Sequence, residues 1–236
     1  MFRGIEFKLP IFEIGLKGYL YGNDAVQLAV AADKVALEYG VTIIFSPQHV
    51  DIPKIADATE HIHVFAQHMD SIPIGRGNGR ILPESIKQAG AVGTLLNHCE
   101  FRLGLHEIAE TIQRADEVGL ATLVCADSPQ EAAAIAQFHP NMILAEPPDL
   151  IGTDNSVASV KQDFVKRTME LVREIDSDIT VFCSAGIRTP ENVADIVRLG
   201  VEATGATSGI VKASDPIGMM RCMIKTMKET WNEMNK

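Results

Sequence analysis

Three side chains suited to proton-transfer chemistry lie at the ends of separate apolar runs. Lys17 follows FEIGL, His98 follows VGTLLN, and Glu146 follows MILA. A carboxylate can remove a proton next to a carbonyl group, an imidazole can polarise or protonate the oxygen, and an ammonium can stabilise the enediolate that forms. If the three side chains face one pocket, they suit abstraction of a proton beside a carbonyl.

Each of these residues also has a purely structural interpretation. Glu146 could form a salt bridge at a rim, His98 could be a hydrogen-bonded residue at a strand end, and Lys17 could simply be solvated. The polar run Gln67–Asp70 is a fourth candidate for chemistry. We favour a subunit contact for that run.

The elements that would position these residues are eight short apolar runs that begin about 27 residues apart, which leaves room for one strand and one helix each time. Most are continuously apolar, as expected for parallel strands buried on both faces. They cover residues 12–17, 42–46, 62–66, 92–97, 121–125, 142–146, 180–184 and 202–207.

The segments between these runs carry helix signals. Apolar residues repeat at spacings of three and four between Ala25 and Ala36, and Ser128–Glu131 forms a capping box with proline in the first turn. Alternating strands and helices predict an α/β fold, a (β/α)8 barrel that forms one domain over residues 1–236. A doubly wound open sheet is the rival, but it usually has fewer strands and a glycine-rich first turn. In a barrel, the three candidate residues would share the catalytic end.

Glycine-bearing loops after three of the later runs predict a phosphate site. The loops cover residues 150–153, 185–187 and 208–209, and they contain Gly152, Gly186 and Gly209. Backbone N–H groups in such loops can hold an anion without a basic patch, and barrels place phosphate after strands seven and eight.

The composition limits the other classes of function. The formal net charge of −10 argues against a nucleic-acid surface, and no apolar run approaches the ~20 residues that a membrane span needs. The four cysteines, Cys99, Cys125, Cys183 and Cys222, lie far apart with no metal-like spacing. We therefore expect free thiols, no metal and a cytoplasmic protein, whose amino-terminal residues lack the apolar core of a signal peptide.

Four motifs, LNHCEFR, AEPPDLIGT, SAGI and ATSGIVKASDP, resemble the triosephosphate isomerase family, in particular its short archaeal-type branch. The similarity covers nearly the whole chain in motif order and spacing. It implies a homodimer or homotetramer of (β/α)8 TIM barrels without a cofactor. It also implies an aldose–ketose isomerase that interconverts dihydroxyacetone phosphate and glyceraldehyde 3-phosphate through an enediolate.

The resemblance assigns roles to individual residues. It implies that Glu146 is the base, His98 the electrophile and Lys17 the catalytic lysine, with Glu100 supporting that lysine. The family's mobile lid falls on residues 147–153. The substrate- and phosphate-binding positions that it implies are Gly15, Ile151, Gly152, Gly186, Thr207, Ser208 and Gly209.

Three positions depart from the family pattern. Gly15 stands where the family has the asparagine of Asn-x-Lys, Cys99 stands where it has serine, and Gly77–Gly79 replaces Thr-Gly in the loop that reaches the neighbouring subunit. We expect a void at Gly15 that a water or an extra substrate carbon fills. A paralogous isomerase of a tetrulose phosphate is therefore one alternative. A non-catalytic barrel that binds a phosphometabolite is another, against which the three retained residues argue.

Overall fold

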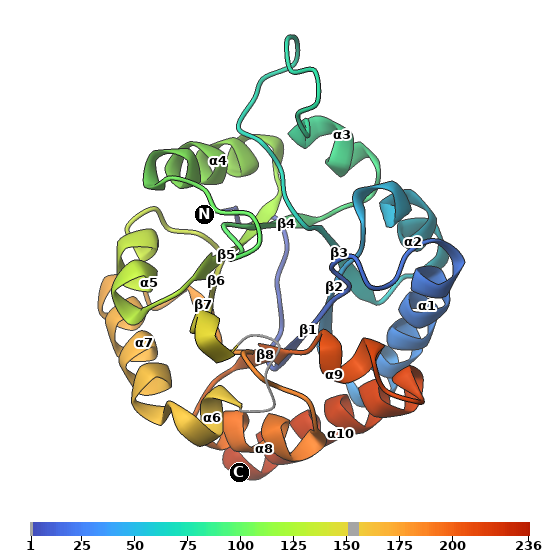
Figure 1. The fold of residues 1–236 in the computed structure, drawn as a ribbon, viewed down its shortest axis with the longest axis vertical. Coiled ribbons are helices and arrows are strands. Elements are labelled where there is room, and N and C mark those ends of the chain that lie inside the picture. The colour runs from blue at the N-terminus through green and yellow to red at the C-terminus, as the bar shows by residue number, and fades with distance from the viewer. Residues whose placement is uncertain (1, 151–155) are drawn as a thin grey trace.

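Eight parallel strands close into a barrel, and helices surround it (Figure 1). The computed structural model describes residues 2–150 and 156–236. The strands follow one another in sequence order, and β8 pairs with β1 to complete the ring. The predicted (β/α)8 architecture is confirmed, and closure between the first and last strands rules out the open sheet.

The strands lie close to the predicted runs. They are β1 Ile11–Gly15, β2 Thr42–Ser46, β3 Ile62–Ala66, β4 Gly93–Leu96, β5 Ala121–Ala126, β6 Met142–Ala145, β7 Thr180–Phe182 and β8 Ala203–Gly205. The helices are α1 Gly22–Tyr39, α2 Ile52–Ala58, α3 Pro83–Gln88, α4 Leu105–Val118, α5 Pro129–Ala136, α6 Val157–Val160, α7 Gln162–Ile175, α8 Pro190–Arg198, α9 Ser208–Val211 and α10 Pro216–Met234. Two short 3-10 turns, η1 His49–Asp51 and η2 Pro148–Leu150, follow β2 and β6.

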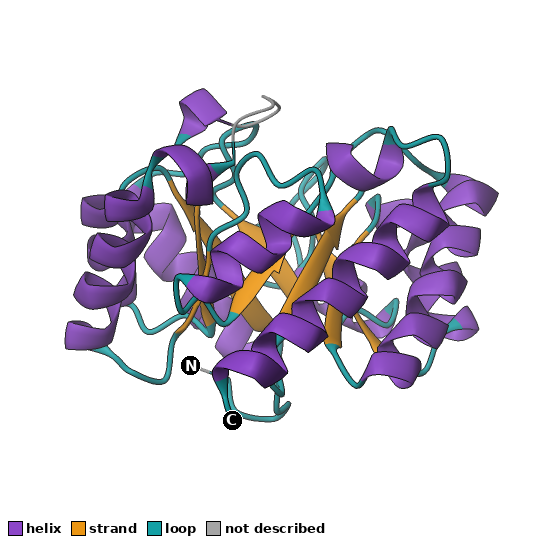
Figure 2. Cartoon of the chain, turned by 90° about the horizontal axis from the view of Figure 1, so that it is seen from below, coloured by secondary structure: helices purple, strands orange, loops and turns teal. Residues whose placement is uncertain are grey.

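The apolar side chains form two layers, one inside the strands and one between strands and helices. Figure 2 shows the helices flanking the strands. Strand alternation sends Phe12 and Ile14 of β1 outward into the larger cluster and Ile11 inward, to the barrel interior. Glu13 shares the inward parity of Ile11 and is itself buried. This charged residue therefore lies on a face that is otherwise apolar along β1.

Side chains cap the starts of α5, where the sequence predicts a capping box, and of α10. Ser128 accepts a hydrogen bond from the backbone N–H of Glu131 at the start of α5, and Asp215 accepts one from Gly218 at the start of α10. These bonds satisfy N–H groups that an uncapped helix leaves unpaired. Among the helices of residues 2–150 and 156–236, none is both long and apolar enough to cross a membrane.

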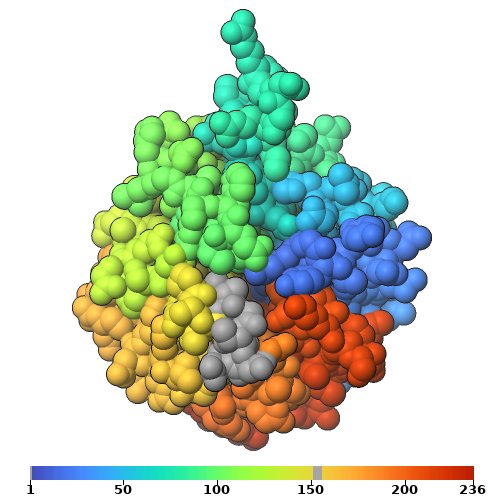
Figure 3. Space-filling view, in the orientation of Figure 1, coloured from blue at the N-terminus to red at the C-terminus, as the bar shows by residue number. Residues whose placement is uncertain are grey.

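The segment between β3 and α3 projects away from the barrel (Figures 1 and 3). Its tip carries Ile74, which is 74% exposed. At its base, Asp70 accepts hydrogen bonds from the Arg80 side chain and from the backbone N–H of Ile81. Hydrogen bonds thus join the two ends of the loop, and its apolar Ile74 is exposed to solvent.

Candidate active site

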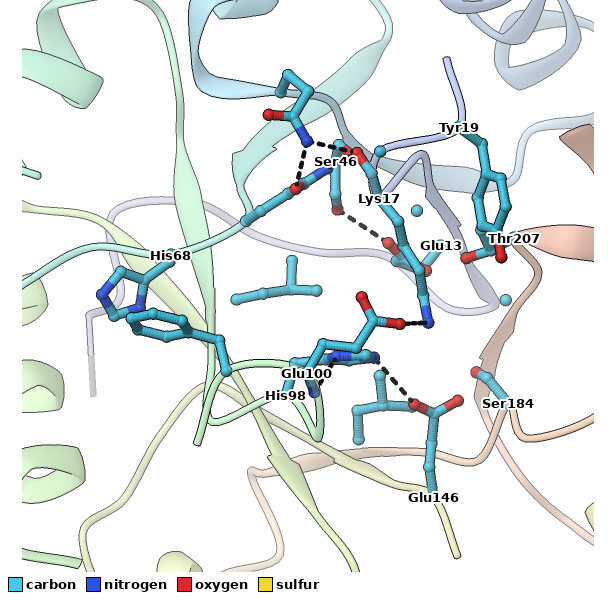
Figure 4. Close-up of a pocket in the computed structure, with 18 of the residues that line it drawn as sticks. Glu13, Lys17, Tyr19, Ser46, His68, His98, Glu100, Glu146, Ser184 and Thr207 are labelled. Atoms are coloured by element: carbon cyan, nitrogen blue, oxygen red, sulfur yellow. Dashed lines mark hydrogen bonds and ion pairs between the residues drawn. The ribbon is translucent and has the colours of Figure 1, made fainter. Parts of the chain in front are cut away.

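The three candidate catalytic residues line one cavity of about 850 Å³ at the carboxyl ends of the strands. Lys17, His98 and Glu146 follow β1, β4 and β6 and point into this space (Figure 4). Their convergence is the arrangement that the strand ends predict. No cluster of three metal-ligating side chains occurs in the part of the chain that the structure describes.

Two glutamines hold the backbone of Lys17 in an uncommon conformation. Lys17 has a φ of 49°, in the left-handed region. Its carbonyl oxygen accepts hydrogen bonds from Gln48 Nε2 at 2.6 Å and Gln67 Nε2 at 3.0 Å. The chain turns here, which ends β1 two residues earlier than predicted and aims the ammonium across the cavity.

The Lys17 ammonium forms an ion pair with Glu100, at 2.8 Å between Nζ and Oε1. Burial opposes the charge on Lys17, but the hydrogen bond to Glu100 outweighs it with the help of nearby carboxylates and raises the pKa of Lys17. Burial likewise works against the charge on Glu100, and Lys17 more than compensates, so the pKa of Glu100 is lowered. Both groups therefore stay ionised around neutral pH.

The side chain of Asn97 positions the turn that carries His98. Asn97 has a φ of 58° and is buried. Its amide group donates to the carbonyl of Cys125 at 2.9 Å and to Glu131 at 3.1 Å, and its oxygen accepts from the N–H of Leu103 at 3.0 Å. These bonds connect the end of β4 to β5, to α5 and to the end of the loop that leads into α4.

His98 presents a hydrogen-bond donor to the cavity. The backbone N–H of Glu100 donates to Nδ1 of His98 at 3.1 Å, so the proton of the neutral ring lies on Nε2. Burial and the charge of Lys17 lower the pKa of His98 to about 4. His98 is therefore a neutral imidazole around pH 7. Its Nε2 lies 3.9 Å from Oε2 of Glu146.

Glu146 has the properties of a general base. The residue follows β6 directly, and its N–H donates to the carbonyl of Ala126 at 2.9 Å. Burial raises the pKa of Glu146 to about 7, with Lys17 opposing the shift and Asp127 and Glu100 adding to it. A carboxylate poised near neutral pH is suited to take a proton from carbon and return it.

The predicted phosphate loops reach the same cavity. Gly186, with a φ of 72°, lines it together with Thr207 and Ser208. The described lining does not include Gly209, where a Cβ would lie 2.7 Å from Cα of Arg188. Close packing thus already requires glycine at 209, and its contact with phosphate stays a prediction. The predicted residues Ile151 and Gly152 lie outside the described residues.

The void expected at Gly15 is wrong. A Cβ at Gly15 would lie 2.9 Å from Oε1 and 3.3 Å from Oε2 of Glu13, and 3.1 Å from Oγ1 of Thr207. Glu13 precedes Gly15 by two residues on the same inward face of β1, and its side chain extends into this space. Ser46 Oγ donates to Glu13 Oε1 at 2.9 Å. The space that Gly15 leaves is therefore filled by a carboxyl group of the same strand.

Polar residues of the cavity that the sequence analysis missed include Glu13, Ser46 and Gln48. Glu13 has a visible signal, a charged residue at an inward position of a buried strand. Gln67 belongs to the run for which we expected a subunit contact, and here its side chain holds Lys17 within the same chain. The subunit contact itself stays a prediction.

Known proteins resemble the chain over most of its length. A family model described as triosephosphate isomerase matches residues 14–223. The triosephosphate isomerase of Methanobacterium bryantii is 41% identical over 88% of this chain and 92% of its own. That of Methanocaldococcus jannaschii is 40% identical over 86% and 93%, and that of Sulfolobus acidocaldarius 37% identical over 92% and 95%, respectively.

Proposed function

Because this chain belongs to the triosephosphate isomerase family, we propose that its cavity interconverts dihydroxyacetone phosphate and glyceraldehyde 3-phosphate, with Glu146, His98 and Lys17 as the reacting residues. The chain is an isomerase, and its substrate is a small phosphorylated sugar. The observation that best supports the residue roles is the neutral His98, whose Nε2–H faces the same space as the Glu146 carboxylate.

The first half of the reaction forms an enediolate. The Glu146 carboxylate takes a proton from C1 of dihydroxyacetone phosphate. The C–H electron pair becomes the C1=C2 bond, and the carbonyl π pair moves to the oxygen on C2. This oxygen gains negative charge, which the Nε2–H of His98 and the Lys17 ammonium stabilise because their positive ends are already oriented toward it.

The second half returns every proton. His98 gives its Nε2 proton to the oxygen on C2 and takes the hydroxyl proton from the oxygen on C1. Glu146 delivers its proton to C2. The product carries an aldehyde at C1 and a hydroxyl at C2, and the protein is back in its starting protonation state, with no electron gained or lost. Glu100 keeps Lys17 charged and in place throughout.

The phosphate is held by backbone N–H groups of the loops after β7 and β8. Gly186, Thr207 and Ser208 line the cavity there, and oriented N–H groups bind anions without a positive side chain. Burial of the phosphate against these loops would fix C1 and C2 between Glu146 and His98. Inorganic phosphate should accordingly compete with substrate.

A coupled assay tests the proposed activity. Purified protein is given dihydroxyacetone phosphate, and glyceraldehyde 3-phosphate is measured by its enzymatic oxidation, beside a panel of four-carbon ketose phosphates. We expect turnover of the triose to exceed that of every four-carbon compound. Turnover of a four-carbon compound with none of the triose would contradict the proposal.

We also propose that the chain forms a homodimer or homotetramer. The projecting segment between β3 and α3 supports this, because it exposes a large apolar side chain, Ile74, to water. The family's corresponding loop, as the resemblance implies, reaches into the neighbouring subunit. Light scattering coupled to size exclusion should give two or four times the mass of one chain, 25.7 kDa. Ile74→Asp should shift the population toward one chain.

Two further proposals concern the chain as a whole. Residues 1–236 form one domain, for which we expect a single cooperative unfolding transition in urea. The protein works in the cytoplasm, which agrees with its four free cysteines. Cell fractionation with a tagged chain tests the location.

A further inference from the structure

Glu13 is a buried carboxyl group that the mechanism above does not use. Alternation along β1 places it on the inward face between Ile11 and Gly15. It is 6% exposed, among the inward apolar residues of the barrel. Burying an ionisable group in such surroundings is costly unless it is hydrogen-bonded, paired with an opposite charge or neutral. The chain nevertheless keeps a glutamate here.

Two glycines make room for this side chain. A Cβ at Gly15 would lie 2.9 Å from Oε1 of Glu13. On the neighbouring strand, Gly205 stands opposite Glu13, and a Cβ there would lie 2.5 Å from the Glu13 carbonyl oxygen and 2.9 Å from its Cβ. Larger residues at either position would push the glutamate aside, so the three positions act as one unit.

The carboxyl group of Glu13 lies on the wall of the catalytic cavity. Ser46, which stands opposite Gly15 in the β1–β2 register, donates to its Oε1 at 2.9 Å (Figure 4). The Glu13 carboxyl is close enough to Lys17 and Glu146 to feel both charges. A substrate held between Lys17 and Glu146 would therefore meet this group.

We propose that Glu13 contacts the substrate, its carboxyl group passing through the space beside Gly15 to form a hydrogen bond with the substrate oxygen that Lys17 also faces. This inference rests on the proposed function, in which that oxygen gains negative charge. A protonated carboxyl group can donate this hydrogen bond. The bond becomes stronger as negative charge develops on the substrate oxygen. Glu13 thus takes the place of a polar side chain at position 15, and it favours substrates that carry an oxygen at this point.

Burial of Glu13 favours its protonated, hydrogen-bond-donating form. Burial raises the pKa of Glu13 to about 7, with Ser46 and Lys17 lowering it and the charge of Glu146 raising it further. The thiol of Cys125 on β5 belongs to the inward cluster and stays protonated, because burial raises its pKa well above the usual value, with the charges of Glu146 and Glu13 adding to the shift. When Glu146 is ionised and able to act as base, its charge helps Glu13 to keep a proton.

The state with Glu146 ionised and Glu13 protonated is therefore the active one. Raising the pH removes the proton from Glu13 and with it the hydrogen bond. We expect kcat/KM for dihydroxyacetone phosphate to rise as Glu146 ionises and to fall again on the alkaline side, with both limbs close to pH 7.

Two substitutions test the role. Glu13→Val removes the donor and should lower kcat/KM about 10- to 100-fold at pH 7, the range for one hydrogen bond to a charged group. Glu13→Gln keeps an N–H donor at every pH, so it should lose less activity and also lose the alkaline fall. Glu174→Gln, an exposed glutamate of α7, is the matched control and should keep the wild-type profile.

The outcomes separate this inference from the proposed function. A wild-type chain without triose phosphate turnover overturns both. An active wild type with an equally active Glu13→Val overturns the role of Glu13 alone. If Glu13→Val does not fold, as circular dichroism will show, the profile of Glu13→Gln decides: loss of the alkaline limb supports the role, and an unchanged alkaline limb overturns it.

Discussion

Two carboxyl groups, Glu146 and Glu13, line one cavity and are held differently. Glu146 follows β6 at the rim and lies 3.9 Å from the His98 ring. Glu13 lies inside β1, and the Ser46 hydroxyl holds one of its oxygens. Burial raises both pKa values to about 7. The comparison teaches that a perturbed pKa marks a functional cavity, whereas geometry decides which carboxyl removes a proton and which one donates a hydrogen bond.

The largest expected effect is at Glu146. Glu146→Gln removes the base and should lower kcat about 1,000-fold, within the range for loss of general base catalysis. Glu146→Asp keeps the charge but withdraws it by about 1 Å, which should cost on the order of 100-fold. Steady-state kinetics on dihydroxyacetone phosphate checks both, and turnover that either substitution leaves unchanged would remove Glu146 from the chemistry.

The pH dependence of stability sharpens the comparison. The folded pKa of Glu13, about 7, lies above its usual 4.5, so the folded chain binds an extra proton between these values. Stability therefore falls as the pH rises from about 4.5 to about 7. Glu13→Gln removes this contribution, which is at most about 3 kcal/mol. Urea unfolding at pH 5 and pH 8 should show a smaller loss for the variant, and equal losses would contradict the buried, titrating Glu13.

Substitution at Gly15 tests whether Glu13 and Gly15 form one unit. Gly15→Asn places a polar side chain in the space beside Gly15. Because the Glu13 carboxyl occupies that space, the asparagine must displace it, and kcat/KM should fall about 10-fold. The double variant Glu13→Val, Gly15→Asn should recover activity relative to either single variant. Effects that simply add would show that the two positions are independent.

The smallest effect concerns the residues that hold Lys17, whose charge influences both Glu13 and Glu146. Gln67→Ala removes one of the two side-chain donors to the Lys17 carbonyl. Gln48 still holds this carbonyl, so the loss of stability should be about 1 kcal/mol. Gln67 Nε2 also donates to the carbonyl of Ser46 at 3.1 Å, and the substitution removes this bond as well. Thermal unfolding measures the change, and a loss several times larger would contradict the support that Gln48 is expected to retain.

The sequence predicts the barrel and the three converging side chains for a physical reason. Buried parallel strands must be apolar, so their spacing is visible, and the residues that follow them share one end of the barrel. The strand ends are less visible, because Lys17 and Asn97 leave the strands through left-handed conformations that non-glycine residues rarely adopt.

The role of Gly15 could not be predicted in this way. A glycine in place of asparagine shows which side chain is absent, but it does not show which neighbour fills the space. Glu13 is two residues away, and only the alternation of β1 together with the register of Gly205 brings its carboxyl to that point. The position of the Glu13 carboxyl thus depends on β1, on Ser46 of β2 and on Gly205 of β8 together.

The central claim is that Glu146 removes a proton from the substrate to give an enediolate. Turnover of dihydroxyacetone phosphate in D2O tests it most directly, with the glyceraldehyde 3-phosphate product analysed by proton NMR. The proton on Glu146 exchanges with solvent, so we predict deuterium at C2 of the product, and Glu146→Asp should slow isomerisation and deuterium incorporation together. A Glu146→Asp variant that forms deuterated product at the wild-type rate would contradict the claim.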